Sequence, residues 1–169
     1  MADQMKNYII PPISRKTGLM IAGLLSTGLL GGALLFQYVG GLAPCSLCIW
    51  QRWPHFVVMV LAVIGLRDVK PVVMLWLIAL AGIVSAGLGA YHAGVEWGIW
   101  SGPDGCTANL SLDGNISQIT DQLLATPVVR CDDVAWSLFG LSMAGWNALI
   151  SLDIVAVALI SLRRMARPD

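Results

Sequence analysis

Four cysteines are the residues of this sequence best suited to chemistry. Cys45 and Cys48 form a CxxC pair, and Cys106 and Cys131 follow it with 24 residues between them. Thiols exchange with disulfides when an attacking thiolate reaches an accessible sulfur. Helix N-termini and nearby cations favour the thiolate. Because Cys48 lies at the predicted start of a helix, with Arg52 four residues later on the same face, we expect Cys48 to be the thiolate.

Two metal-based uses of these cysteines fit the spacing less well. A structural zinc site takes four ligands and usually pairs its cysteines closely on both sides, which Cys106 and Cys131 do not do. Covalent haem attachment needs CxxCH, and Ile49 stands where the histidine is required. The pattern therefore favours thiol redox chemistry, and no metal is expected.

The elements that must position these cysteines come from an unusually apolar chain. Of its 169 residues, 57% are hydrophobic and only 12% are charged, and the mean hydropathy is +0.75. A soluble domain carries about 25% charged residues. Ten basic and ten acidic side chains cancel, so no net field attracts nucleic acid. The composition predicts an integral membrane protein whose surroundings are the lipid bilayer, with no nucleic-acid partner.

Four stretches are long and apolar enough to cross a bilayer, which takes about 20 residues. They cover residues 17–39, 49–66, 71–91 and 144–162, approximately. We therefore predict an all-α membrane protein with a single four-helix domain over residues 1–169. A short outer loop over about 40–48 and a long one over about 92–143 complete it. Apolar residues at helical spacing within 116–125 predict a short helix, either on the membrane surface or within the loop.

Basic residues near the ends of the spans predict the orientation. With four spans, eight of them fall on one side, which the positive-inside rule assigns to the cytoplasm. They are Lys6, Arg15, Lys16, Arg67, Lys70, Arg163, Arg164 and Arg167. Both termini are then cytoplasmic, and all four cysteines lie in the periplasm, where disulfides persist. Glu96 is expected among the acids of the long outer loop.

Two charged residues and a histidine also fall within the predicted spans. An arginine one turn into a membrane helix is costly unless it has a partner or reaches the interface, and the spacing of Arg52 to Cys48 favours a functional role. His55 lies one turn deeper, and we expect it to serve in packing or at the interface. Asp153 falls near the middle of the fourth span, where we expect it to be protonated or paired with a neighbouring helix.

Three segments resemble the bacterial disulfide bond formation protein B (DsbB) family. They are PCSLCIWQRWP over residues 44–54, YHAGVEW over residues 91–97, and the stretch that leads from Cys131 through Trp136 to Met143. The resemblance runs from about Thr17 to Leu162, and its P-C-x-x-C-x-x-x-R block at the mouth of the second span is specific.

The resemblance implies a quinone-dependent thiol–disulfide oxidoreductase of the bacterial inner membrane. A soluble periplasmic thiol oxidase of the DsbA type would attack a Cys106–Cys131 disulfide at Cys106. Electrons would pass through a transient Cys45–Cys131 bond to the Cys45–Cys48 pair, and Cys48 would deliver them to membrane quinone, either ubiquinone or menaquinone. Arg52 and His92 match the family pattern as quinone-binding residues. An interfacial histidine facing headgroups is the alternative for His92.

Other functions stay open at this point. A paralogue could serve a dedicated partner, and a non-catalytic membrane scaffold could use its cysteines only to staple the loops. An enzyme like vitamin K epoxide reductase would place its CxxC late in the chain, whereas Cys45 and Cys48 are early. A metal-binding membrane protein is the most distant alternative.

Overall fold

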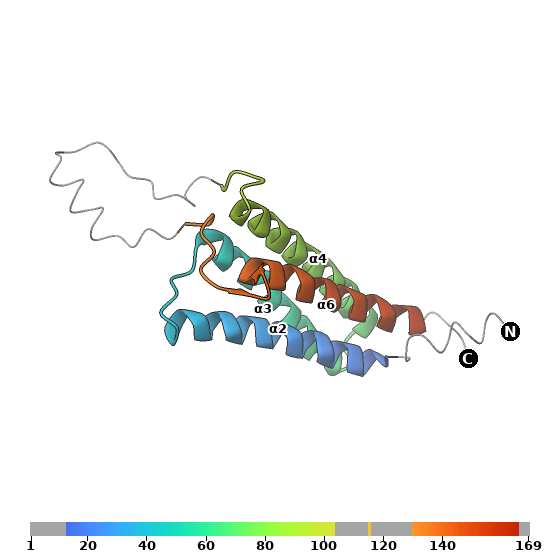
Figure 1. Cartoon of the computed structure of the whole chain (residues 1–169). Helices are drawn as coiled ribbons and strands as arrows, with labels where there is room; N and C mark the ends of the chain where they lie inside the picture. The colour runs from blue at the N-terminus through green and yellow to red at the C-terminus, as the bar shows by residue number, and fades with distance from the viewer. Residues whose placement is uncertain (1–12, 104–114, 116–129, 166–169) are drawn as a thin grey trace.

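Four long helices run side by side in alternating directions and form most of the part of the protein that the structure describes (Figure 1). The computed structural model describes residues 13–103, 115 and 130–165. The helices are α2 (Arg15–Tyr38), α3 (Ser46–Leu66), α4 (Pro71–Glu96) and α6 (Met143–Met165). All four are long and apolar enough to cross a membrane. The predicted all-α, four-span fold is confirmed.

Local sequence signals explain where the helices begin. Ser14 caps α2 by accepting a hydrogen bond from the N–H of Thr17 at 3.1 Å, as short polar side chains do at helix N-termini. Helix α4 begins at Pro71, whose fixed φ suits the first helical position. Between α3 and α4, Asp68 forms ion pairs with Arg15 at 2.8 Å and Lys16 at 3.2 Å, which hold the start of α2 against this turn.

The helices extend beyond two predicted ends, and both differences affect the site. Helix α3 begins at Ser46 rather than near residue 49, with Cys45 as its N-cap. Helix α4 continues to Glu96, five residues past its predicted end at 91. The apolar stretch of the sequence ends at the polar His92. Ala93 and Val95 are nevertheless buried, which keeps the last turns of the helix inside the bundle. The placement of Glu96 in the outer loop is therefore wrong.

Each helix packs against two neighbours. Helix α3 contacts α2 and α4, and α6 contacts α4 and α2. An apolar core of mostly small and branched side chains fills the half of the bundle near the α3–α4 turn, and its buried members are Leu19, Ala22, Val58, Ala62, Leu75, Ile78, Ala79, Ile154 and Ala158.

Glycines set the distance between α4 and α6. A Cβ added at Gly89 would lie 2.9 Å from the backbone nitrogen of Ala148 and 3.0 Å from the carbonyl oxygen of Ala144. Small residues allow this close approach of helix backbones in lipid, where apolar side chains alone give little drive for association.

The outer faces of the helices are apolar, as expected of surfaces that meet lipid. Leu24, Leu35 and Leu80 are among the exposed large side chains. Asp153 is also exposed on α6, and no hydrogen bond or ion pair reaches it from the described residues. The predicted pairing of Asp153 with a neighbouring helix is therefore wrong for this part of the chain, and nothing in the structure explains the residue.

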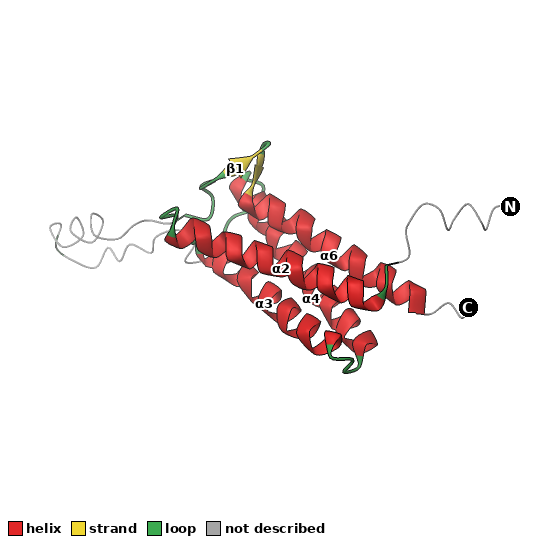
Figure 2. Cartoon of the chain, turned by 90° about the horizontal axis from the view of Figure 1, so that it is seen from below, coloured by secondary structure: helices red, strands yellow, loops and turns green. Residues whose placement is uncertain are grey.

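A two-stranded hairpin precedes α6 at the end of the bundle opposite the α3–α4 turn (Figure 2). Strand β1 (Ser137–Leu138) pairs antiparallel with β2 (Leu141–Ser142). The two turn residues, Phe139 and Gly140, both have positive φ, at 52° and 79°, which suits a tight two-residue hairpin. The helix predicted within 116–125 lies outside the described residues.

Replacing Gly89 by alanine should destabilise the protein, since the new Cβ meets backbone atoms that cannot rotate away. We expect a loss of about 1–3 kcal/mol in the free energy of unfolding, measured by thermal or denaturant unfolding in detergent. Gly87→Ala is the matched control on the same helix, because nothing lies within 4 Å of a Cβ there. Equal effects of the two substitutions would contradict the packing described here.

Candidate active site

The thiol pair lies at the N-terminus of α3. Cys45 caps the helix, and its Sγ accepts a hydrogen bond from the N–H of Cys48 at 3.2 Å. The two sulfurs are hydrogen-bonded at 2.8 Å, and both cysteines are free thiols. The CxxC spacing produces this arrangement because the residue three positions after the cap has its N–H directed back at the capping side chain.

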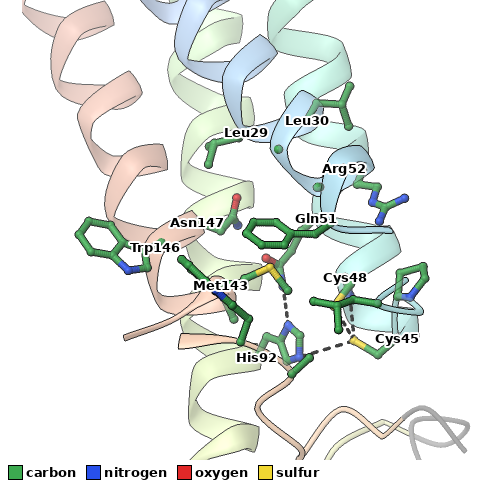
Figure 3. A pocket seen from close by; sticks show the side chains of 18 of the residues that line it. Leu29, Leu30, Cys45, Cys48, Gln51, Arg52, His92, Met143, Trp146 and Asn147 are labelled. Atoms are coloured by element: carbon green, nitrogen blue, oxygen red, sulfur yellow. Dashed lines mark hydrogen bonds between the residues drawn. The ribbon is translucent and has the colours of Figure 1, made fainter. Parts of the chain in front are cut away.

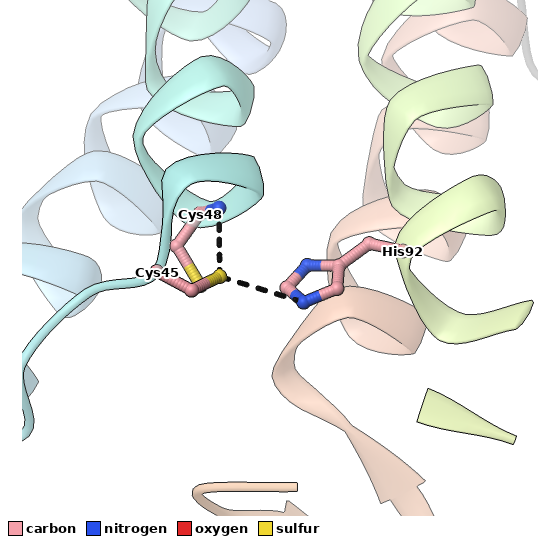
Figure 4. Close-up of side chains that lie close together, drawn as sticks. All are labelled: Cys45, Cys48 and His92. Atoms are coloured by element: carbon pink, nitrogen blue, oxygen red, sulfur yellow. Dashed lines mark hydrogen bonds between the residues drawn. The ribbon is translucent and has the colours of Figure 1, made fainter. Parts of the chain in front are cut away.

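His92 approaches the pair from the last turns of α4 (Figure 4). Its Nε2 lies 3.6 Å from the Sγ of Cys45, and its Nδ1 lies 2.8 Å from the Nε2 of Gln51 on α3. When the Gln51 amide donates to Nδ1, the imidazole proton sits on Nε2 and faces the Cys45 sulfur. Glu96 follows one turn later, with Oε1 3.9 Å from the His92 Nε2.

Cys45, rather than Cys48, has the environment of a thiolate. The hydrogen bond with the Cys48 thiol holds the pKa of Cys45 well below its ordinary value. Burial opposes this shift, and hydrogen bonds from His92 and from the Cys48 N–H support it. The expected thiolate was Cys48, whereas the geometry favours Cys45, because the helix begins at Ser46 and its N-terminal amides act on Cys45.

Cys131 packs directly against this pair. It is only 1% exposed and belongs to a buried cluster with Cys45, Leu47 and Val95. Its Sγ lies 3.7 Å from the Oγ of Ser46, and it is disulfide-bonded. The structure therefore brings three predicted cysteines and His92 together, while Cys106 lies outside the described residues.

A cavity of about 340 Å³ opens beside the thiol pair (Figure 3). Its apolar wall comes from α2, from the segment before α3, and from the segment that runs through β1 to the start of α6. The α2 residues of that wall are Gly28, Leu29, Leu30, Gly32, Ala33 and Phe36. Its polar edge contains Cys45, Cys48, Gln51, Arg52 and His92. An apolar space with a few convergent polar groups is typical of a small-molecule site.

Two buried polar atoms on this edge have no hydrogen-bond partner among the described residues. They are the Nε of Arg52 and the Oε2 of Glu96. Arg52 is held by its other end, since Nη1 donates to the Oε1 of Gln37 at 2.6 Å. Buried polar groups are nearly always paired, so a donor and an acceptor remain available to a ligand in the cavity.

His55 closes the deeper end of the cavity within a polar cluster that joins all four helices. Its Nε2 lies 2.6 Å from the Oδ1 of Asn147 and 3.1 Å from the Oγ of Ser85. Its Nδ1 lies 3.5 Å from the Oγ of Ser26. Because His55 is buried, the structure supports the packing role expected for it rather than the interfacial one.

Gln51 and Glu96 are the site residues that the sequence analysis did not identify. Glu96 stands four residues after His92, so a helix continued through residue 96 would have placed both on one face. Gln51 lies between Cys48 and Arg52, and no sequence signal marks it as the partner of a histidine 41 residues away.

The reduced protein should carry one thiolate near neutral pH, and it should belong to Cys45. At pH of about 6, where an ordinary thiol is protonated, we expect thiolate ultraviolet absorbance from the wild type and its loss in Cys45→Ser. Cys48→Ser should retain the signal, because a serine hydroxyl and the same backbone N–H still donate to Cys45. A signal lost only in Cys48→Ser would reverse the assignment.

Comparisons with known proteins agree with this geometry. The family model for the disulfide bond formation protein DsbB matches residues 15–161. Disulfide bond formation protein B of Acidovorax sp. (strain JS42) is 30% identical, with 98% of this chain and 97% of the relative covered. The protein of that name from Dechloromonas aromatica (strain RCB) is 33% identical, with 86% and 90% covered. The chain therefore belongs to the DsbB family and is a membrane oxidoreductase that generates disulfide bonds.

Proposed function

We propose that this protein reoxidises a soluble periplasmic thiol oxidase of the DsbA type and passes the electrons to membrane quinone. The observation that carries the proposal is the position of the Cys45–Cys48 pair. It lies between a buried, disulfide-bonded cysteine, Cys131, and an apolar cavity. A relay between an aqueous thiol and a lipid-soluble oxidant needs these two neighbours.

The proposed relay begins with attack by the partner's thiolate on Cys106 of a Cys106–Cys131 disulfide. A mixed disulfide with Cys106 forms, and Cys131 leaves as the thiolate. Cys131 then attacks Cys45 of the oxidised inner pair, forms a Cys45–Cys131 bond and releases Cys48. The partner's second thiol then attacks the mixed disulfide. The partner leaves with its own disulfide, and Cys106 is released as a thiolate. Cys106 attacks Cys131, which restores the outer disulfide and leaves both inner cysteines reduced.

One feature supports this order of transfer. Cys131 and Cys45 pack in one buried cluster, which places the outer cysteine next to the inner pair that it must attack.

The cavity suits a quinone. Its wall is apolar, as the ring and tail require, and the unpartnered Nε of Arg52 provides a buried donor for a carbonyl oxygen. A bound quinone would accept two electrons and two protons from the dithiol. Arg52 contributes a fixed positive charge where negative charge develops, and His92 holds a proton between its Nε2 and the sulfur of Cys45.

We also infer the orientation in the bacterial inner membrane. Five basic residues lie at the end of the bundle that holds the α3–α4 turn, whereas the thiol pair lies at the opposite end of α3. Arg15 and Lys16 begin α2, Arg67 and Lys70 lie in the turn between α3 and α4, and Arg163 lies in the last turn of α6. The positive-inside rule then places that end and both termini in the cytoplasm and the cysteines in the periplasm.

The proposed activity can be tested with purified protein in lipid nanodiscs, a reduced DsbA-type oxidase and a soluble quinone analogue. We expect quinone absorbance to fall in step with oxidation of the partner, at one quinone per disulfide formed. Cys48→Ser should abolish both signals, since the inner pair can no longer form. Loss of quinone at the same rate with Cys48→Ser would contradict the proposal, as would partner oxidation without quinone loss.

The cavity itself can be tested with two glycines of α2. A Cβ at Gly31 or at Gly32 meets nothing within 4 Å, but only Gly32 lines the cavity. Gly32→Leu should fill the space and raise the KM for quinone at least about tenfold, which corresponds to about 1.4 kcal/mol. Gly31→Leu should leave the KM near the wild-type value. Equal KM values for the two variants would place the quinone elsewhere.

A further inference from the structure

Three metal-binding atoms gather at the thiol pair. The Sγ atoms of Cys45 and Cys48 and a ring nitrogen of His92 all lie within 4.8 Å of one another. Thiolate sulfur and imidazole nitrogen are the ligands that Zn²⁺ prefers, in a tetrahedral arrangement. We propose that the reduced Cys45–Cys48 pair binds Zn²⁺ together with His92 and Glu96, and that the bound ion blocks disulfide generation.

The distance between Cys45 and His92 already matches such a site. Zinc–sulfur bonds of about 2.3 Å and zinc–nitrogen bonds of about 2.0–2.1 Å put the two ligand atoms about 3.6 Å apart around a tetrahedral ion. The Cys45 Sγ and the His92 Nε2 are 3.6 Å apart. The two sulfurs, at 2.8 Å, would have to separate by about 1 Å to bind one ion, which a small rotation of the Cys48 side chain provides.

Glu96 supplies an independent indication of a cation. Its side chain is only 5% exposed, and its Oε1 lies 3.9 Å from the His92 Nε2. Its oxygens lie outside the group formed by the other three ligand atoms, so the side chain would have to turn towards the two sulfurs to bind the same ion. Its Oε2 is buried with no hydrogen-bond partner among the residues that the structure describes. A buried carboxylate oxygen without a donor is unfavourable, and a metal ion held by the neighbouring ligands would satisfy it.

Gln51 can support the histidine as a ligand. Zinc bound to Nε2 requires the imidazole proton on Nδ1, and zinc-binding histidines usually donate that proton to an acceptor. The Gln51 amide lies 2.8 Å from Nδ1. A rotation of this amide by about 180° puts its carbonyl oxygen where its NH₂ group stood. The oxygen then accepts a hydrogen bond from the Nδ1–H of His92.

Binding at this site depends on the redox state. Zn²⁺ replaces the protons of the two thiols, and no electrons are transferred. A Cys45–Cys48 disulfide offers no thiolate, so the oxidised pair cannot form the site. The ion therefore holds the pair reduced and prevents its reoxidation. The site uses neither Cys106 nor Cys131, which distinguishes it from the four-cysteine zinc site that the spacing disfavours.

The test uses full-length, quinone-free protein in nanodiscs, reduced and then freed of reductant under anaerobic conditions. After incubation with ZnSO₄ and desalting, elemental analysis should find one zinc per reduced protein and none when the inner pair is oxidised. Co²⁺ in place of Zn²⁺ should give the absorption bands of a tetrahedral site with sulfur ligands. No retained zinc on the reduced protein would overturn the proposal, as would equal retention by the oxidised protein.

Variants separate this site from a bare dithiol. His92→Ala and Glu96→Gln should each weaken Zn²⁺ affinity at least about tenfold in a competition with a chromophoric chelator. Asp132→Asn, which removes an exposed carboxylate bound to Arg130, should leave the affinity unchanged. Circular dichroism checks that each variant is folded, and Glu96→Gln carries the test if His92→Ala is not. Wild-type affinity in Glu96→Gln would remove Glu96 from the site, and the proposed ligand set would be wrong.

Discussion

The hydrogen bond from the N–H of Cys48 to the sulfur of Cys45 is the contact on which the site depends. It makes a cysteine the cap of a membrane helix, so a thiol that can become a nucleophilic thiolate stands where serine or aspartate is usual. The sulfur is thereby held where α3 leaves the apolar core, within reach of His92 on one side and Cys131 on the other. Reactivity and helix geometry are set by the same atoms, which is why the CxxC spacing matters.

The two halves of the bundle are packed differently. Near the α3–α4 turn, small and branched apolar side chains form a buried core. Towards the thiol pair, α2 has glycine at positions Gly28 and Gly32. These residues have no side chain to fill the interior, and the cavity lies beside them. The polar cluster around His55 lies between these two regions and joins α2, α3, α4 and α6 through hydrogen bonds. In a membrane such bonds help to fix how helices pack.

Much of the fold and part of the candidate site can be predicted from the sequence. Hydropathy alone indicates four spans. Motif and spacing single out Cys45, Cys48 and Arg52, and the family resemblance adds His92. The errors arose where burial, rather than polarity, decides the outcome: α4 continues past His92 because its last turns are packed against neighbours. The pairing of Gln51 with His92 joins residues 41 positions apart, so it depends on how α3 and α4 are rotated against each other. The spacing of residues along the sequence does not determine that rotation.

The cavity beside the thiol pair is the proposed binding site of the oxidant. Photo-cross-linking in nanodiscs with a quinone analogue that carries a light-activated group tests it directly, with the labelled peptides mapped by mass spectrometry. We expect labels on residues 28–36 of α2 and 143–147 of α6, and we expect an excess of unlabelled quinone to remove them. Labels confined to the outward face of α4 between residues 72 and 84, or labels that competition does not remove, would contradict this binding site.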